Sequence, residues 1–333
     1  MDVAEKAGVS LGTVSRVINN DAHVAPETRE RVGAVMRELG YVVNRQARSL
    51  KGSRTNVIGV LVPDLGTGYI GEIMRGIDAE LALSQLDLML FTTHRTAIKE
   101  ASYVANLVEG MVDGLLVVLP RNPVDYTGSL TRRNFPFVLI DHQGTGEQCP
   151  AVGATNWQGA YNATEYLIKS GHTRIGFITG SMDLGCAVDR LAGYRSALRT
   201  HHIPDASELV YEGNFFQPDG YAGALALLDL PEPPTAIFAS NDVMAMGVMD
   251  AVRNRGLRIP EDVSVVGFDD IPQSAVVFPP LTTVRQPLEQ MGSVATQVLL
   301  GILKSPEKEA GRIELPTELV VRGSTTNLKD RAG

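Results

Sequence analysis

The sequence has little of what marks membrane proteins, disulfide-stabilised proteins and metalloproteins. None of its apolar runs approaches the roughly 20 residues that a membrane-spanning helix needs, so no membrane partner is expected. Its two cysteines, Cys149 and Cys186, lack the close spacing of metal ligands. We therefore expect two ordinary thiols in a reducing compartment, with no metal and no cofactor. The capped amphipathic helix predicted at the start of the sequence is not typical of a signal peptide, which favours a cytoplasmic, nucleoid-associated location.

Catalytic signatures are also missing. Residues 63–69 follow the first predicted strand and contain a Gly-x-Gly pattern, but they lack the third glycine of a dinucleotide-binding fingerprint. Ser181 and Ser240 do not stand in the sequence frame of a nucleophile elbow. None of the six histidines has catalytic or metal-binding spacing. The sequence therefore predicts a protein that is not an enzyme.

Positive charge is scarce overall but is concentrated in one segment. The net charge is −8, yet residues 1–56 hold nine Lys or Arg and six Asp or Glu, a local charge of +3. The rest of the chain carries −11. Because attraction to phosphate acts over about 10 Å at ordinary salt, the local charge matters more than the total. The first 56 residues are thus suited to nucleic acid although the whole protein is acidic.

The first twenty residues predict two short helices joined by a tight turn. Gly8 suits the turn, and Ser10 stands where its hydroxyl would cap the second helix. Three residues of that helix, Val14, Val17 and Ile18, fall on one side and predict its buried face. This pattern is that of a helix-turn-helix.

The opposite side of the second helix is predicted to be exposed and polar. It consists of Gly12, Ser15, Arg16 and Asn19, with Leu11 at the margin. A helix that follows a tight turn and exposes Arg, Ser and Asn is typical of a reader of the DNA major groove. On these residues alone, an ordinary helical hairpin remains an alternative.

A third helix completes the predicted small domain. Pro26 suits the first turn of this helix, and Gly40 suits its end. Its apolar stripe, which would close a three-helix core, consists of Val32, Val35, Met36 and Leu39.

From residue 57 the pattern changes to buried apolar runs that alternate with helices. The predicted strands are 57–62, 87–91, 115–119, 137–140, 174–179, 209–212, 236–239 and 263–266. The predicted helices include 71–84, 159–170, 191–201, 242–255 and 288–303. This alternation predicts an α/β architecture of parallel sheets flanked by helices. We expect two similar lobes, at about 57–154 and 156–284, with residues 288–303 and 315–323 returning between them.

Polar side chains are predicted at strand ends, where ligands of parallel sheets bind. Two lobes that face each other would form a cleft that closes on a small molecule. Carboxylates accept hydrogen bonds from sugar hydroxyls, and Asn and Arg donate them in fixed geometry. The four candidates at strand ends are Asp141, Arg190, Asn241 and Asp269.

The sequence resembles the LacI/GalR (lactose-repressor) family of bacterial transcription regulators. The N-terminal matches are DVAxxAGVSxxTVSRVIN, TRERV and NRxARSL, and the later ones are RLAGY, ASNDVMAMG, SVVGFDD, PPLTTVRQP and LPTELVVRGS. The resemblance spans nearly the whole chain. It implies an N-terminal all-α helix-turn-helix domain and an α/β two-lobed effector domain like that of periplasmic binding proteins.

The resemblance also implies domain boundaries. The DNA-binding domain would span 1–43, the hinge helix and linker 44–56, the effector-binding and dimerisation domain 57–327, and a tail 328–333. Lobe 1 would comprise about 57–155 and 287–314, and lobe 2 about 156–284 and 315–327.

As a member of this family, the protein would bind a pseudo-palindromic operator as a homodimer. Hinge helices would pair in the minor groove, with Leu50 as an apolar wedge between base pairs. The hinge, with Asn44 as N-cap and then 45–50, is under two turns long, so we expect it to fold only on DNA. The residues expected to contact DNA are Ser10, Leu11, Gly12, Thr13, Ser15, Arg16, Asn19, His23, Arg45, Ala47, Arg48, Leu50 and Lys51.

The same resemblance implies an effector pocket. The expected effector-binding residues are Thr67, Tyr69, Asp141, Arg190, Phe215, Asn241, Asp269 and Gln286. The sequence departs from the family pattern at residues 67–70, where an Asn-Pro-Phe-Phe-like stretch is usual, and at Thr155, where Asp is usual. These departures bear on which effector binds. Trp157, the only tryptophan, would either stack on a sugar ring or pack structurally.

The expected function is a repressor of carbohydrate-utilisation genes that responds to a small sugar-like effector. One alternative is a regulator that responds to purines or nucleosides as corepressors. Another is a solute-binding protein, which would share the two lobes but would not carry a helix-turn-helix. The sequence does not show whether the effector weakens operator binding (induction) or strengthens it (corepression), although induction suits a sugar-type pocket. No heptad-bearing tail follows the last motif, so we expect a dimer.

Overall fold

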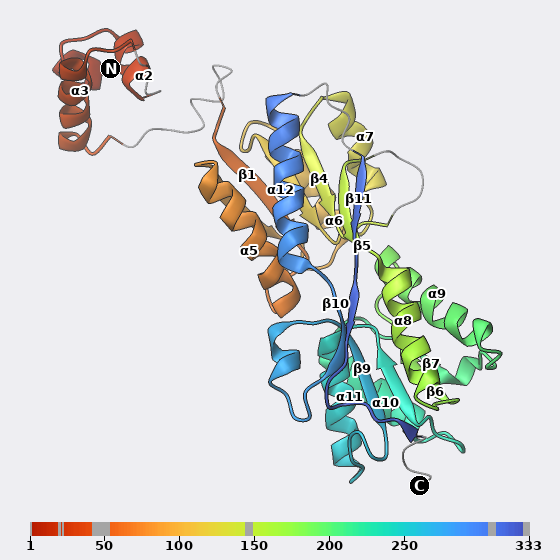
Figure 1. Cartoon of the computed structure of the whole chain (residues 1–333). Helices are drawn as coiled ribbons and strands as arrows, with labels where there is room; N and C mark the ends of the chain where they lie inside the picture. Colours follow the sequence, from red (N-terminus) through yellow and green to blue (C-terminus); the bar gives the residue numbers. More distant parts are fainter. Residues whose placement is uncertain are drawn as a thin grey trace. The chain divides into compact units, whose positions relative to one another are not determined.

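The structure, a computed structural model, describes residues 2–18, 21, 23–41, 54–143, 149–305 and 311–328 (Figure 1). The chain divides into two compact units, Met1–Thr55 and Asn56–Gly333. The predicted hinge helix at 44–50 lies outside the described residues. So do six residues expected to contact DNA, which are Asn19, Arg45, Ala47, Arg48, Leu50 and Lys51.

The first unit contains the three predicted helices, α1 (Asp2–Lys6), α2 (Leu11–Ile18) and α3 (Pro26–Glu38). Gly8, between α1 and α2, has a φ of +63°, which glycine adopts without steric cost. The Ser10 hydroxyl accepts a hydrogen bond from the Thr13 N–H at 3.1 Å, so the predicted cap is confirmed. The buried core consists of Val3, Ala4, Ala7, Val14, Val32 and Val35.

Leu39 does not belong to this core, and the prediction that placed it there was wrong. α3 ends at Glu38, so that Leu39 is the residue after the last helical turn and is 41% exposed. Gly40 then takes a φ of +58°. Leu39 thus lies at the very end of α3, where no other described element of the core covers it.

The second unit contains two six-stranded sheets. Sheet A comprises β1 (Val57–Val62), β2 (Asp87–Thr92), β3 (Gly114–Val118), β4 (Phe137–Ile140), β5 (Ala151–Ala154) and β11 (Arg312–Leu315). Sheet B comprises β6 (Ile175–Ile178), β7 (Val210–Tyr211), β8 (Ala236–Ala239), β9 (Ser264–Asp269), β10 (Thr282–Arg285) and β12 (Glu318–Val320). The orders are β11-β5-β4-β3-β1-β2 and β12-β10-β9-β8-β6-β7, which are the same arrangement. All neighbouring pairs are parallel except β10–β12, which confirms the predicted parallel sheets.

Helices cover both faces of each sheet (Figure 1). The helices of sheet A are α5 (Gly68–Leu83), α6 (Ala97–Leu107), α7 (Val124–Arg132) and α12 (Leu288–Lys304). Those of sheet B are α8 (Asn156–Lys169), α9 (Gly185–Thr200), α10 (Gln217–Leu228) and α11 (Asp242–Asn254). Two short 3-10 helices, Ser207–Leu209 and Pro272–Ala275, complete the elements. We call sheet A with its helices lobe 1, and sheet B with its helices lobe 2.

The β1 residues show why the strands read as continuous apolar runs. Ile58 and Val60 pack in the cluster of α5 and α12, whereas Val57 and Leu61 pack in the cluster of α6 and α7. Side chains of a strand alternate between the two faces of a sheet. A strand that is covered on both faces therefore needs apolar residues at every position.

Helices α5 and α12 touch backbone to backbone. A Cβ on Gly76 would lie 1.9 Å from the Glu289 carbonyl oxygen, and a Cβ on Gly292 would lie 2.1 Å from the Ile73 carbonyl oxygen. Real Cβ atoms do not approach a neighbour so closely, so only glycine fits at either position. The two glycines hold these helices in one fixed packing.

The chain crosses between the lobes three times. The crossings lie between β5 and α8, between β10 and α12, and between β11 and β12. Two of them are bonded to each other, because the Thr317 N–H donates to Thr155 Oγ1 at 3.0 Å and Thr317 Oγ1 donates to the Thr155 carbonyl at 3.2 Å. We call these three crossings the interlobe hinge, to distinguish them from the predicted hinge helix at 44–50.

Candidate DNA interface and effector cavity

Helix α2 exposes the side that was predicted to read DNA. Leu11 is 63% exposed, and Gly12 and Arg16 are also exposed. Thr13 and Ser15 are half-buried. The exposed residues of α2 thus include one long cationic side chain and one apolar side chain, and these two types distinguish guanine from thymine in the major groove.

The loop after α2 holds another predicted DNA contact, His23, in an exposed position. The Asp21 N–H donates to the Arg16 carbonyl at 3.0 Å, which ties this loop to the end of α2. The His23 N–H donates to Asp21 Oδ1 at 2.9 Å, and the ring Nδ1 lies 3.0 Å from the same oxygen. These hydrogen bonds from His23 lower the pKa of Asp21.

A cavity lies between the two lobes. The lobe 1 lining is Pro63, Asp64, Thr67, Tyr69, Ile70, Arg95, Leu119, Arg121 and Asp141, and the lobe 2 lining is Leu184, Cys186, Arg190, Phe215, Asn241 and Asp269. Several of these residues directly follow the carboxyl ends of strands, as expected for open parallel sheets. Seven of the eight predicted effector residues line the cavity.

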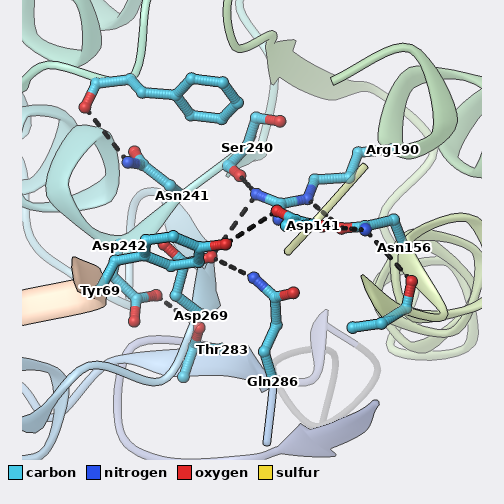
Figure 2. A network of polar contacts seen from close by, with 12 residues as sticks. Tyr69, Asp141, Asn156, Arg190, Ser240, Asn241, Asp242, Asp269, Thr283 and Gln286 are labelled. Atoms are coloured by element: carbon cyan, nitrogen blue, oxygen red, sulfur yellow. Dashed lines mark hydrogen bonds and ion pairs between the residues drawn. The ribbon is translucent and has the colours of Figure 1, made fainter. Parts of the chain in front are cut away.

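Arg190 is the centre of the polar contacts beside the cavity (Figure 2). It lies within α9 and not at a strand end, so that detail of the prediction was wrong: its long side chain reaches inward from the helix. Nε donates to Asn156 Oδ1 at 2.8 Å, and Nη1 donates to the Ser240 carbonyl at 2.5 Å. Nη1 also lies 3.5 Å from Asp269 Oδ1, and the guanidinium stacks 3.8 Å from the Phe268 ring centroid. Arg190 is only 2% exposed, so these partners compensate for the burial of its charge.

Asp141 gathers three donors on the lobe 1 side of the same network. Tyr69 Oη donates to Oδ2 at 2.8 Å, while Gln143 Nε2 and Asn156 Nδ2 donate to Oδ1 at 2.8 and 3.3 Å. Asn156 therefore bridges Asp141 and Arg190 from its place directly after a chain crossing. The hydrogen bonds from Asp141 through Asn156 to Arg190 thus join both lobes at the interlobe hinge.

Gln286 supports the cavity and does not line it. Its Nε2 donates to Asp269 Oδ1 at 2.8 Å, and its backbone N–H donates to the Asp269 carbonyl at 3.2 Å. It is 3% exposed and stands at the crossing between β10 and α12. The sequence motif thus identified a residue next to the cavity. Its side chain holds Asp269, which lines the cavity, and does not line the cavity itself.

Asn241 lies on the cavity wall, yet its side chain serves the fold. Its Oδ1 accepts a hydrogen bond from the Met244 N–H at 2.9 Å, so it is the N-cap of α11. Its Nδ2 donates to the Phe215 carbonyl at 3.2 Å. These contacts position Phe215, and the expectation that the Asn241 amide also meets the ligand stays a prediction.

Burial shifts the acid–base behaviour of the cavity groups. Burial raises the pKa of Asp269 well above its ordinary value, although the positive charge of Arg190 opposes the shift. Burial acts to lower the pKa of Arg190, but the combined effect of the acidic groups around it, Asp269 foremost, outweighs burial and the pKa rises. Burial and the neighbouring Asp141 raise the pKa of Tyr69. Arg190 therefore stays charged, and Tyr69 stays a neutral donor.

Asp242, next to Asn241 in the sequence, is buried and joins three segments of lobe 2; Figure 2 shows its contact with Thr283. Its carboxylate accepts from Thr283 Oγ1 of β10, from Ser274 Oγ at 2.7 Å and from the Ile271 N–H at 2.9 Å. It is fully buried, and burial raises its pKa to about 7 despite these hydrogen bonds.

Left-handed backbone conformations gather around the cavity. Five lining residues that are not glycine have positive φ, between +50° and +117°, and they are Arg95, Leu119, Asp141, Phe215 and Asp269. Such conformations cost free energy and persist where the surrounding structure fixes them, which is common at binding sites. Leu119 was predicted as the last residue of a strand, but β3 ends at Val118 and the chain turns there toward the cavity.

Sequence analysis missed several residues of this site. Arg95 and Arg121 come shortly after β2 and β3, so the rule that ligands lie at strand ends contained a signal for them. Asn156 is recognisable only in space, because it bridges two residues far apart in the sequence. Trp157 stacks on Tyr161 at 5.3 Å and is not part of the cavity lining, which favours the packing interpretation.

Two further expectations concern metals and membranes. Among the described residues, no group of three or more His, Cys, Asp and Glu side chains is arranged to hold a metal ion. No helix within the described ranges is both long and apolar enough to span a bilayer.

Comparison with known proteins agrees with both units. Residues 1–44 match the family model of bacterial regulatory proteins of the lacI family, and residues 164–325 match a periplasmic binding protein-like domain. The HTH-type transcriptional repressor PurR of Vibrio atlanticus (strain LGP32) is 35% identical over 328 residues, which cover 98% of each chain. The HTH-type transcriptional repressor CytR of Escherichia coli (strain K12) is 35% identical over 98% of this chain and 96% of its own length.

The fold as a whole also matches a solved structure. The lac repressor dimer bound to operator and the anti-inducer ONPF superposes with a TM-score of 0.84 at 32% identity, covering 98% of each chain. Identity above 30% across essentially the whole length, a matching helix-turn-helix model and the shared two-lobed architecture all agree. The chain belongs to the LacI family of DNA-binding bacterial transcriptional regulators.

Proposed function

We propose that the protein is a homodimeric repressor of carbohydrate-utilisation genes whose affinity for a pseudo-palindromic operator changes when a small, uncharged, hydroxyl-rich effector fills the cavity. The observation that carries the proposal is the enclosed Arg190–Asp269 pair beside a cavity that both lobes line. A regulator of this kind acts on the chromosome, in the cytoplasm.

The charges of the cavity favour an uncharged effector. Asp64 is paired with Arg95, and Asp269 with Arg190, while Asp141 accepts from three neutral donors. A ligand that carried its own charge would bury that charge without a partner, or would break an existing pair. A phosphorylated or acidic sugar is therefore disfavoured.

Hydroxyl groups match what the site offers. The contacts of Arg190 use Nε and Nη1, which leaves the Nη2 donors for a ligand. The carboxylates of Asp269 and Asp141 are acceptors that face the same cavity. Paired donors and acceptors of this kind recognise the vicinal hydroxyls of a sugar or of a ribose moiety.

Effector binding would change DNA binding by moving the two lobes about the interlobe hinge. Asn156 and Gln286, which hold Arg190 and Asp269, both stand at chain crossings. A ligand that draws Arg190, Asp269 and Asp141 together would therefore change the angle between the lobes. Differential affinity of the effector for two such arrangements is sufficient for allostery.

A purine or nucleoside effector is the second candidate. Leu184, Ile70 and the Phe215 ring form apolar walls on which a flat base could pack. The ribose of a nucleoside would then meet the same carboxylates and guanidinium.

A thermal-shift panel tests both candidates on the full chain. The panel contains ribose, galactose, cellobiose, adenosine, hypoxanthine and ribose 5-phosphate. We expect a neutral member to raise the unfolding temperature, and ribose 5-phosphate to leave it unchanged. Asp269→Ala is the matched control, in which the shift should disappear. Stabilisation by ribose 5-phosphate alone would contradict the uncharged-effector proposal.

The active compound is then added to the wild-type protein on its operator, selected from random DNA. Fluorescence anisotropy should show a change in operator affinity, and its sign decides between induction and corepression. An effector that binds but leaves the affinity for operator unchanged would contradict the regulatory role.

A further inference from the structure

Two arginines of lobe 1 stand at the mouth of the cavity. Arg95 and Arg121 both line the cavity, and their side chains are also 19% and 16% exposed to solvent. A side chain that touches both the cavity and the solvent lies at the boundary between them. These two arginines therefore border the route by which a ligand enters.

Arg95 reaches across to lobe 2. Its Nη1 donates to the Asn214 carbonyl at 3.3 Å, and its guanidinium carbon lies 4.0 Å from the centroid of the Phe216 ring. Its Nε donates to Asp64 Oδ2 at 2.6 Å, which orients the guanidinium from the lobe 1 side. Both contacted residues precede α10, so the link joins β2 of lobe 1 to the α10 end of lobe 2.

Arg121 makes a second link. Its Nη1 forms an ion pair with Asp183, which lies just before α9 in lobe 2. Ser181 Oγ donates to the other carboxylate oxygen of Asp183 at 2.5 Å and fixes the carboxylate. The same loop continues into Leu184 and Cys186, which form part of the cavity wall. The link is therefore made by the loop that also encloses the ligand.

We propose that the Arg121–Asp183 ion pair and the Arg95–Phe216 stacking contact form a latch that holds the lobes closed over the cavity. Neither arginine contributes to the described hydrogen bonds of Arg190 and Asp269, so the latch controls entry and residence, and the inner network controls recognition. The trapped molecule is the effector of the proposed function. The latch itself is a property of the protein without ligand.

The strength of these contacts suits a latch that opens reversibly. Partly exposed ion pairs and cation–π contacts are each weak, so each shifts an equilibrium by a few-fold and not by many orders of magnitude. Because two separate links must open together, the closed arrangement is favoured more than either link alone would favour it.

Hydrogen exchange measured by mass spectrometry on the full, ligand-free protein tests the latch. The readout is the exchange of backbone amides in residues 181–188 and 213–220, at the lobe 2 side of the mouth. Arg121→Ala and Asp183→Ala should each raise this exchange about two- to fivefold. The double alanine variant should exchange no faster than Asp183→Ala, because Asp183→Ala already removes the ion pair together with the hydrogen bond from Ser181.

Two further variants make the test specific. Exchanging the charges, with Arg121→Asp and Asp183→Arg in one protein, should restore slow exchange. Arg255→Ala is the matched control, because it removes an ion pair with Asp229 that lies wholly within lobe 2. Unchanged exchange in both single variants, equal acceleration in Arg255→Ala, or fast exchange in the charge-exchanged protein would each overturn the latch. Because no ligand is added, such a failure is separate from a failure of the effector proposal.

Discussion

At the scale of single residues, the cavity depends on one buried guanidinium. Arg190 contacts a residue of a chain crossing, the end of β8 and the end of β9, so three segments are held by one planar group. Removing one partner of a buried ion pair leaves the other charge without compensation. Substitution of Asp269 or Arg190 should therefore lower the stability of the protein more than substitution of Arg95 or Arg121 at the mouth of the cavity.

Asp269→Ala should raise the effector dissociation constant at least tenfold. The carboxylate loses its contacts with ligand hydroxyls, and a hydrogen bond to a charged group is worth about 1.5–3 kcal/mol. Asp269→Asn, which keeps one acceptor oxygen, should lose less. Calorimetric titration with the compound found in the thermal-shift panel measures both. Operator affinity without effector should stay at the wild-type value, and a normal effector response in Asp269→Ala would place the site elsewhere.

Stability should fall as pH rises through neutrality because of Asp242. Its pKa is raised by burial to about 7, against 3.8 for an ordinary carboxyl, so at pH 5 the folded protein holds a proton that the unfolded chain has released. Raising the pH from 5 to 8 removes this proton and weakens the folded state, by about 1.3 kcal/mol if half of the roughly 2.7 kcal/mol expected over this range survives relaxation. Urea unfolding across this range measures the trend. Asp242→Asn cannot ionise, so an equally steep decline in that variant would exclude Asp242 as its source.

At the scale of elements, α2 presents a small reading surface. Its apolar side is buried at Val14, and Arg16 is its exposed cation. Gly12 offers no side chain to the groove, so specificity near it should rest on Leu11 against a thymine methyl group. Few side chains therefore carry the discrimination between bases.

Arg16→Ala should weaken operator binding by about 1–3 kcal/mol and relax one base position in each half-site. Binding to random DNA should fall much less. Arg31→Ala, which removes another exposed positive charge, from α3, is the control for charge alone. Anisotropy titrations on operator and random duplexes separate the two effects. An equal loss on both duplexes in Arg16→Ala would mean that Arg16 contacts phosphate and not a base.

The elements that sequence analysis predicted are those with a strong local pattern. β1 reads Val-Ile-Gly-Val-Leu-Val and is identifiable without a partner. β5 reads Ala-Val-Gly-Ala, and nothing in these four residues marks a strand until β4 and β11 pair with it. The residues beside the cavity also differ in whether a local sequence pattern identifies them. Asp141 follows a clear strand, whereas Asn156 acquires its role only when folding brings Asp141 and Arg190 to its two sides.

At the scale of the whole molecule, the two units differ greatly in the size of their cores. The buried apolar core of Met1–Thr55 described here consists of six small residues, from Val3 to Val35. The second unit contains four larger clusters. A small domain buries a smaller fraction of its surface and is correspondingly less stable.

Calorimetry should therefore show two transitions in the free protein, with the N-terminal unit melting first. The effector should shift only the upper transition, because the cavity lies wholly within the second unit. Operator DNA should shift the lower one. A single transition that moves as a whole with either ligand would show that the two units unfold together.

The backbone contact between α5 and α12 limits how lobe 1 can respond to its ligand. α12 begins beside the Gln286 crossing, and α5 begins beside Thr67 on the cavity wall. Because Gly76 and Gly292 leave no side chain between them, a push on one helix cannot be absorbed by rotamer changes and must displace both. An alanine at either glycine would act as a wedge between the helices. A genetic screen for regulators that fold, repress and ignore their signal should therefore recover these two positions, although neither glycine lines the cavity.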